Sequence, residues 1–189
     1  TFTVGTLLPE TGSLAFLGPP EFAGVDLAVR DINEAGGVNG EEIPDAIQGD
    51  SGDTSTDIAS QTSDRLLSEN ADVIVGAASS GVSLTVIDKI TGAGVIQFSP
   101  ANTAPDFTDY DDNGLYFRTA PSDVLQGQLL GEIIAGDGNA TLGILALDDP
   151  YGTGLADFVE ESFTDSGGEV VEKVIYDPNA TNFDAEVQQ

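Results

Sequence analysis

The feature that most constrains the fold of this sequence is a regular alternation of short apolar runs with longer segments of helical periodicity. Strand-like runs are expected at residues 2–8, 43–49, 72–76, 95–98, 115–119, 141–147 and 169–176, the second being weak because Pro44 and Asp45 interrupt it. Helices are expected from about residue 20 until Gly36, at 54–69, after Ser79 or Ser80, at 122–135, at 153–165 and from about residue 182. This alternation is typical of βαβ units on a parallel sheet and predicts the α/β class.

A polar loop rich in proline and aspartate, residues 99–114, separates two groups of these units. We expect residues 1–119 to form one Rossmann-like lobe. Residues 120–189 are then the first part of a second Rossmann-like lobe. They contain at most three strand-like runs, which is too few for a closed lobe, so the second lobe is expected to be incomplete (truncated) in this chain.

The charge of the chain is strongly one-sided. It has 33 acidic and 5 basic residues and a formal net charge of -28, while 40% of its residues are hydrophobic. The apolar content is sufficient for a core, so the acidic side chains are expected on a folded surface, as in halophilic proteins whose repulsion is screened by molar salt. Nucleic acid is excluded as a partner, because the bases are scattered: Arg30, Arg65, Lys89, Arg118 and Lys173.

The sequence contains no cysteine and no histidine. Catalytic triads and histidine-based or thiolate metal sites are therefore excluded, and an enzyme would have to rely on carboxylates. The run 109–114 resembles the opening of a calcium loop, but its twelfth position is Ala120 instead of glutamate, which favours an acidic surface loop. No glycine-rich segment has the spacing of a nucleotide site. We expect neither a metal nor a cofactor.

Three loops follow strand-like runs and are rich in small hydroxyl side chains: residues 9–13, 78–81 and 99–103. Open α/β sheets present ligands at the carboxyl ends of their strands, where helix N-termini and backbone N–H groups converge. Each loop by itself is also typical of ordinary helix capping. Three loops at one sheet edge favour a site that holds a carboxylate without an arginine.

Five sequence strings carry a resemblance to a known family. They are Pro9-x-Thr-Gly at 9–12, Ala28-x-x-Asp-Ile-Asn-x-Ala-Gly-Gly-Val-Asn-Gly at 28–40, Ser-Pro-x-x-Thr-Ala-Pro at 99–105, Phe-Arg-Thr-x-Pro-Ser-Asp-x-x-Gln-Gly at 117–127 and Tyr-Gly-x-Gly-Leu-Ala at 151–156. In this order they resemble the leucine/isoleucine/valine-type solute-binding proteins of ABC importers, over nearly the whole chain. The resemblance implies the type I periplasmic-binding-protein fold, in which a ligand is held between two lobes.

The resemblance also implies which residues contact the ligand. In the family's pattern, the carboxylate and the amine of the ligand are bound by residues that correspond to Ser80, the backbone of Ala101 and Thr103, with Ser79 and Asn102 beside them. The aromatic side chain that lies across the ligand corresponds to Tyr151. Leu17 stands where members that bind branched-chain amino acids often have an aromatic residue, so the side-chain pocket differs. Related proteins bind amides, urea or aromatic acids, and the resemblance leaves the ligand open.

The resemblance further implies a non-enzymatic, extracellular or cell-surface receptor that delivers a small amino-acid-like or carboxylate ligand to a membrane permease. Two Asn-Ala-Thr triplets, at Asn139 and Asn179, are consistent with that location. Two alternatives remain open at this point. The same fold serves as the sensing domain of signalling receptors, and an α/β enzyme that uses acidic residues would show turnover.

Overall fold

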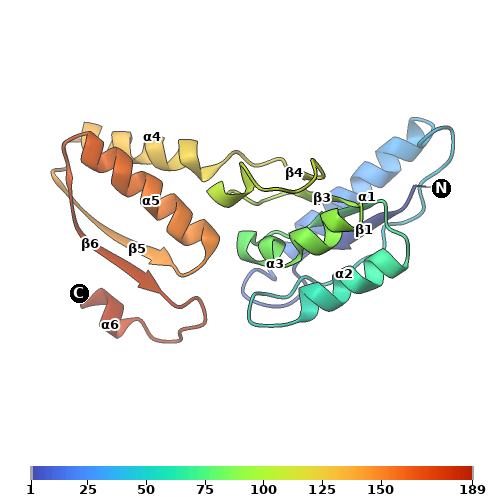
Figure 1. Ribbon diagram of the computed structural model, residues 1–189, viewed down its shortest axis with the longest axis horizontal. Helices are drawn as coiled ribbons and strands as arrows, with labels where there is room; N and C mark the ends of the chain where they lie inside the picture. The colour runs from blue at the N-terminus through green and yellow to red at the C-terminus, as the bar shows by residue number, and fades with distance from the viewer. Residues whose placement is uncertain (1, 189) are drawn as a thin grey trace. The chain divides into compact units, whose positions relative to one another are not determined.

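A computed structural model describes residues 2–188 (Figure 1). The chain divides into two compact units, and each is described by itself. The first contains Thr1–Asn102 and Asp111–Ala120, and the second contains Thr103–Tyr110 and Pro121–Gln189. Among the helices of residues 2–188, none combines the length and the apolar character needed to cross a bilayer.

The first unit is built on a parallel sheet of four strands in the order β1-β2-β3-β4. The strands are β1 (Val4–Leu7), β2 (Val73–Gly76), β3 (Ile96–Ser99) and β4 (Tyr116–Arg118). The weak run expected at 43–49 is not a regular strand. It nevertheless lies parallel to the free side of β1, where Thr6 N donates to Ile47 O at 2.9 Å and Leu8 N donates to Gly49 O at 3.0 Å.

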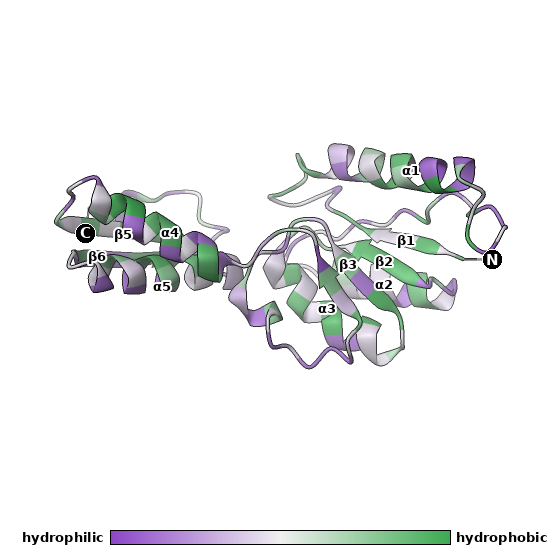
Figure 2. Cartoon of the chain, turned by 90° about the horizontal axis from the view of Figure 1, so that it is seen from above, coloured by the Kyte–Doolittle hydropathy of each residue, from purple (hydrophilic) through white to green (hydrophobic). Residues whose placement is uncertain are grey.

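Three helices cover the two faces of this sheet (Figure 2): α1 (Gly18–Glu34) lies on one face, and α2 (Ile58–Ser68) and α3 (Ser80–Gly92) lie on the other. Val29 of α1 packs with Val4 and Ile43. The expected apolar face of α3, namely Val82, Val86, Ile87 and Ile90, is fully buried, as is Leu66 of α2. Burial of such side chains contributes about 1.5–3 kcal/mol each. The core of the unit therefore consists of the apolar side chains on both faces of the sheet and those of the helices that cover them.

Local sequence signals explain where these helices begin and end. Ser79 caps α3, its Oγ accepting a hydrogen bond from Val82 N, as expected. Gly36 and Gly37 follow the end of α1 with φ angles of 108° and 74°, and their N–H groups donate to the carbonyls of Asn33 and Ile32. The helix α1 begins two residues earlier than expected, because Pro19 and Pro20 fit its first turn.

The second unit contains a 3-10 turn at Pro105–Phe107, helix α4 (Asp123–Gly136), strand β5 (Thr141–Leu147), helix α5 (Pro150–Asp165), strand β6 (Glu169–Tyr176) and the short helix α6 (Asp184–Val187). The strands β5 and β6 are parallel and have the bounds expected from the sequence. Helices α4 and α5 pack side by side (Figure 1). Helix α5 begins three residues before its expected start, because Asp149 caps it and Pro150 occupies its first turn.

Much apolar surface of the second unit faces water. Phe163 is fully buried, and Ala156 and Val159 are nearly so, all of them on α5. On α4, however, three large side chains are exposed by about half, namely Leu125, Leu129 and Ile133. Residues 2–188 thus give this unit only a small core around α5, and its two-stranded sheet is below the size at which sheets are independently stable.

The division between the units differs in detail from the boundary expected at residue 119. Residues 103–110 belong with the second unit, although the strand that follows them, β4, belongs with the first. The reason lies in tertiary contacts. The carbonyl of Thr103 accepts a hydrogen bond from Asp123 N at 2.8 Å, and Pro105 packs closely against Gly154 of α5.

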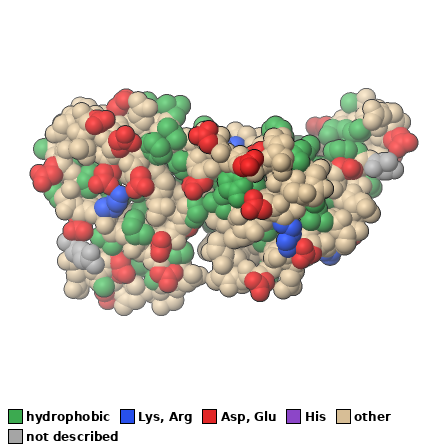
Figure 3. All heavy atoms as spheres, in the orientation of Figure 1, with side chains coloured by type: hydrophobic (Ala, Val, Ile, Leu, Met, Phe, Trp, Pro, Cys, Tyr) green, Lys and Arg blue, Asp and Glu red, His purple; other side chains and the backbone are tan. Residues whose placement is uncertain are grey.

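The charged side chains are distributed as the composition suggests. On the face drawn in Figure 3, aspartate and glutamate side chains are scattered over both units and basic side chains are few. Among residues 2–188, ion pairs join Arg30 with Glu34, Arg65 with Glu69, Lys89 with Asp64, and Lys173 with Asp157 and Glu160. These pairs engage only a minority of the 33 acidic residues, so most of the carboxylates have no basic side chain to offset them.

Candidate functional site at the carboxyl edge of the first sheet

The order of the strands in the first unit marks one edge of its sheet as the candidate ligand site. The segment 43–51 follows β1 in the chain and lies on one side of it, whereas β2 lies on the other side. The chain direction across the sheet therefore reverses at β1. In open α/β sheets, ligands bind outside the carboxyl ends of the strands at such a reversal. The loops after β1, β2 and β3 meet this edge.

The loop after β1, residues 8–13, is held in place by one carboxylate. Asp50 Oδ1 accepts hydrogen bonds from the backbone N–H groups of Glu10 (2.9 Å), Thr11 (3.1 Å) and Gly52 (2.8 Å). Its Oδ2 accepts a hydrogen bond from Thr11 Oγ1. Burial raises the pKa of Asp50, but these four hydrogen bonds outweigh that effect and hold its pKa below its ordinary value.

We expect the Asp50 contact to depend on pH in a defined direction. Because the pKa of Asp50 is lower in the folded chain than in the unfolded chain, its stabilising effect is present above the unfolded pKa and is lost as the pH falls through the folded one. Asp50→Ala should lower the free energy of unfolding by about 1–2 kcal/mol at neutral pH and flatten its decrease on acidification. Urea unfolding at constant molar salt, from pH 7 to pH 3, measures both.

Asp45→Ala is the matched control for this prediction. Asp45 is also acidic and lies in the same segment, but its side chain is exposed. The two substitutions change the net charge equally, so a difference between them reports the hydrogen bonds of Asp50. Equal stabilities and equal pH profiles of the two variants would contradict the assigned role.

The loop after β2 leads into the N-terminus of α3. Ser79 is half-buried and its Oγ caps the helix, accepting from Val82 N at 3.3 Å, while Ser80 is only 4% exposed. The N–H groups of the first helical turn point out of the helix end, where the helix dipole also favours an anion. A ligand carboxylate at this position would need no basic side chain.

The loop after β3 is shaped by Ser99. Its Oγ accepts hydrogen bonds from the N–H groups of Ala101 (3.2 Å) and Asn102 (3.0 Å). Ala101 is half-buried, and because its N–H is used in this turn, its carbonyl is the backbone group suited to a ligand. The side chain of Asn102 is fully buried and hydrogen-bonded inside the unit, so its geometry favours a supporting role over direct ligand contact.

Three further residues are assigned to the ligand by the resemblance: Leu17, Thr103 and Tyr151. Leu17 is half-buried at the start of α1, where the chain comes so close to the Pro9 carbonyl that a Cβ on Gly18 would lie 2.0 Å from it. Thr103 and Tyr151 belong to the second unit, where Tyr151 is 41% exposed in the first turn of α5. Burial, followed by the nearby carboxylates of Asp123 and Asp149, raises the pKa of Tyr151, so the phenol is neutral at physiological pH.

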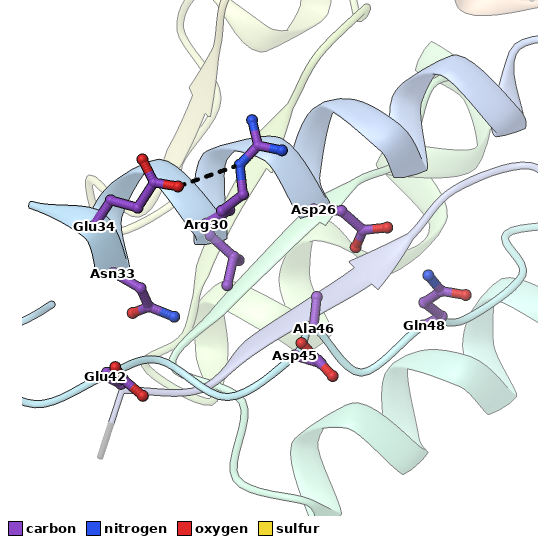
Figure 4. Close-up of a pocket in the computed structure, with 9 residues that line it drawn as sticks. Asp26, Arg30, Asn33, Glu34, Glu42, Asp45, Ala46 and Gln48 are labelled. Atoms are coloured by element: carbon purple, nitrogen blue, oxygen red, sulfur yellow. Dashed lines mark ion pairs between the residues drawn. The ribbon is translucent and has the colours of Figure 1, made fainter.

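A hollow of the first unit lies between α1 and the segment 42–48 (Figure 4). Its polar lining is mostly acidic, and Arg30 there pairs with Glu34 at 3.8 Å. Asn33 closes its end by exchanging two hydrogen bonds with the backbone of Ile43. This end corresponds to the amino ends of the strands, where open α/β sheets do not present ligands. The hollow is therefore a weaker candidate than the carboxyl edge.

The acidic run 109–114 is an exposed turn, in which Asp112 Oδ1 accepts a hydrogen bond from Gly114 N at 2.6 Å. Asn113 and Gly114 both have positive φ angles, 58° and 71°. Within residues 2–188 no group of three or more aspartate, glutamate, histidine or cysteine side chains is arranged to hold a metal ion.

The sequence pattern does not identify the supporting contacts of three buried polar residues. Gln97 lies in the strand-like run 95–98, Ser99 is the first residue of the loop expected at 99–103, and Tyr116 lies in the strand-like run 115–119. All three are buried, and each takes part in side-chain hydrogen bonds near the carboxyl edge. The only available signal is a polar or hydroxyl-bearing residue at a strand position expected to face the core.

Comparisons with known proteins agree with this geometry. The sequence matches the family described as periplasmic binding protein over residues 1–189. It is 30% identical over 167 residues to a Leu/Ile/Val-binding protein homolog of Brucella abortus, covering 87% of this chain and 44% of that protein. It is 30% identical over 168 residues to the leucine-, isoleucine-, valine-, threonine-, and alanine-binding protein of Pseudomonas aeruginosa, covering 88% and 44%.

A solved structure shows the same fold. The branched-chain amino acid transporter substrate-binding protein LivJ of Streptococcus pneumoniae, in complex with isoleucine, superposes with a TM-score of 0.81 at 29% identity. The match covers 100% of this chain and 53% of that chain. This chain thus spans about half the length of the relatives it matches. That share is consistent with the incomplete second lobe expected from the sequence. The match over its whole length shows that the chain belongs to the periplasmic binding protein family.

Proposed function

We propose that this chain is the ligand-binding part of a receptor that captures a small amino acid or a related carboxylate and presents it to the permease of an ABC importer. The observation that carries the proposal is the carboxyl edge of the first sheet. There, a helix N-terminus with Ser79 and Ser80 lies beside the turn in which the N–H of Ala101 is used by Ser99, so that the Ala101 carbonyl is the backbone group we propose for the ligand. The helix N-terminus favours a carboxylate and the Ala101 carbonyl favours an amine, so the two together favour a zwitterionic ligand.

The relatives support the same class of ligand. The Pseudomonas aeruginosa relative is named for the binding of five amino acids, four of them aliphatic and the fifth threonine, and the Streptococcus pneumoniae structure contains isoleucine. Both are binding proteins, which supports a receptor outside the cytoplasm in preference to an enzyme. We propose that Thr103 and Tyr151 of the second unit also contact the ligand, the first as a donor and the second through its ring.

A ligand screen tests this function. Thermal unfolding of the polypeptide expressed from the complete gene is measured at molar salt with L-leucine, L-isoleucine, L-valine, L-alanine, urea and benzoate. A ligand that binds the folded state raises stability by RT ln(1 + [L]/Kd), or about 2.7 kcal/mol at one hundred times Kd. We expect at least one aliphatic amino acid to raise the Tm. If only urea or benzoate raises the Tm, the proposed ligand class is wrong and that compound indicates the correct one. If no compound raises the Tm, the proposal is rejected.

Two substitutions test the anchoring residues. Ser80→Ala and Thr103→Ala each remove a hydroxyl that we propose hydrogen-bonds the ligand, so each should weaken binding by about 1–3 kcal/mol, or roughly 5- to 150-fold in Kd. Calorimetric titration with the amino acid found in the screen measures the loss. Thr85→Ala is the control, because Thr85 lies exposed on α3 and its hydroxyl donates to Val82 O. Unchanged affinity in both test variants would disprove this assignment.

A further inference from the structure

Three successive carbonyls at the carboxyl end of β2 accept hydrogen bonds from side chains of β3 and of the loop that follows it. Gln97 Nε2 donates to Gly76 O at 3.2 Å, Ser99 Oγ donates to Ala77 O at 2.7 Å, and Asn102 Nδ2 donates to Ala78 O at 2.9 Å. We call these three side chains, with the carbonyls of residues 76–78, the polar clasp. All three side chains are fully buried.

The polar clasp joins β2 to the β3 side of the sheet beyond the point where the backbone pairing of these two strands ends. The register between β2 and β3 stops at the pair of Val75 and Phe98. Residues 76–78 are nevertheless buried, and a buried carbonyl without a hydrogen bond is costly. The side chains of β3 and its loop meet this need. As a result they hold the loop after β3 against the loop after β2, two of the three loops of the candidate site.

One further contact fixes the outermost member of the polar clasp. Tyr116, at the start of β4, donates its hydroxyl hydrogen to Asn102 Oδ1 at 2.8 Å. Burial raises the pKa of Tyr116 well above its ordinary value, so the hydroxyl stays protonated and remains a donor. Asn102 is thus held on both sides of its amide, by Tyr116 through the oxygen and by Ala78 through the nitrogen.

We infer that Tyr116 and Asn102 act as a pair of positioning residues, which set the distance between the Ala101 carbonyl and the N-terminus of α3 and thereby the affinity for a zwitterion. Neither side chain needs to touch the ligand. The ligand-binding part of this inference rests on the proposed function, whereas the ordering of the loop does not.

The test compares Tyr116→Phe with Thr91→Val. The first substitution removes the hydroxyl that donates to Asn102 and also interacts with Ser99 of the same turn. The second removes a hydroxyl that is also buried, but that donates to Ile87 O near the far end of α3. Both variants lose one buried hydroxyl, so Thr91→Val controls for a general loss of stability. Amide hydrogen exchange is measured in the 189-residue chain at molar salt.

We expect Tyr116→Phe to speed the exchange of the Ala101 and Asn102 amides by about threefold or more, and to leave the amides at the end of α3 unchanged. Thr91→Val should show the opposite pattern. If Tyr116→Phe leaves the two loop amides as slow as in the parent, or speeds all amides equally, the positioning role is disproved. This readout needs no ligand, so it stands even if the ligand screen fails.

A double-mutant cycle tests the consequence for binding, with L-isoleucine as the probe and the polypeptide of the complete gene as the receptor. Tyr116→Phe and Asn102→Ala should each raise the Kd about 3- to 20-fold, and the double variant should lose little more than the worse single variant, because residues that act as one unit are not additive. Thr91→Val should leave the Kd within about twofold. Additive losses, or an unchanged Kd in both single variants, would overturn the inference. If the parent does not bind L-isoleucine, the amino acid found in the ligand screen replaces it as the probe. A parent that binds none of the ligands in the screen would count against the proposed function and leave the exchange result to decide the positioning role.

Discussion

At about 0.05 M salt we expect this chain to lose most of its folded structure, and at molar salt we expect it to fold. The net charge of -28 lies on 189 residues, and the basic side chains are too few to compensate it. The Debye length is about 3 Å at 1 M salt and above about 10 Å near 0.05 M, so neighbouring carboxylates repel one another only in dilute salt. Circular dichroism and thermal unfolding across this range measure the effect. The Tm should fall by about 10 °C or more, which corresponds to a loss of about 3–5 kcal/mol.

Two controls separate screening from other effects of salt. Sucrose stabilises folded proteins through exclusion from their surface but screens no charge, so it should rescue the fold at low salt only weakly. A second control changes several exposed acidic side chains to their amides and should fold at lower salt than the parent; suitable positions are Asp26, Glu42, Asp45, Asp111 and Asp137. An unchanged spectrum and Tm from molar to about 0.05 M salt would refute the halophilic interpretation.

Gly76→Ala is expected to be the most damaging single substitution at the candidate site. Gly76 ends β2 with a φ of 136°, which side-chain-bearing residues rarely adopt, and a Cβ there would lie 1.9 Å from the carbonyl oxygen of Leu7. Both effects involve backbone that is paired in the sheet, so neither is relieved by a side-chain rotation. We expect a loss of about 3 kcal/mol or more in the free energy of unfolding, the sum of backbone strain and overpacking.

Two other glycines separate these causes. Gly94 has a φ of 78° and open space where a Cβ would be added, so Gly94→Ala should show the cost of the conformation alone, about 1–2 kcal/mol. Gly92 ends α3 with no heavy atom within 4 Å of an added Cβ, and Gly92→Ala should be neutral or stabilising by up to about 1 kcal/mol. Urea unfolding at molar salt ranks the three. If Gly76→Ala is no worse than Gly94→Ala, the close approach to Leu7 is not a constraint.

The three loops of the candidate site could be predicted from the sequence, but the side-chain contacts that connect them could not. The loops follow from the alternation of strands and helices, which also left Ser79 and Ser80 as alternative caps of α3, and the structure has Ser79 as the cap. By contrast, Asn102 stands in a polar loop, where nothing nearby in the chain indicates that its amide turns inward. Its partners, Ala78 and Tyr116, lie 24 and 14 residues away.

The sequence by itself determined the α/β class, the bounds of β5 and β6, and the buried face of α3, because each depends on the spacing of apolar residues within one segment. Only the tertiary structure decided that the segment 43–51 lies along β1, that residues 103–110 belong with the second unit, and that the polar clasp joins the loops after β2 and β3. The physical reason is that a buried hydrogen-bonding group needs a partner, and the partner comes from whichever distant part of the chain packs against it. Such pairs leave no periodic pattern in the sequence.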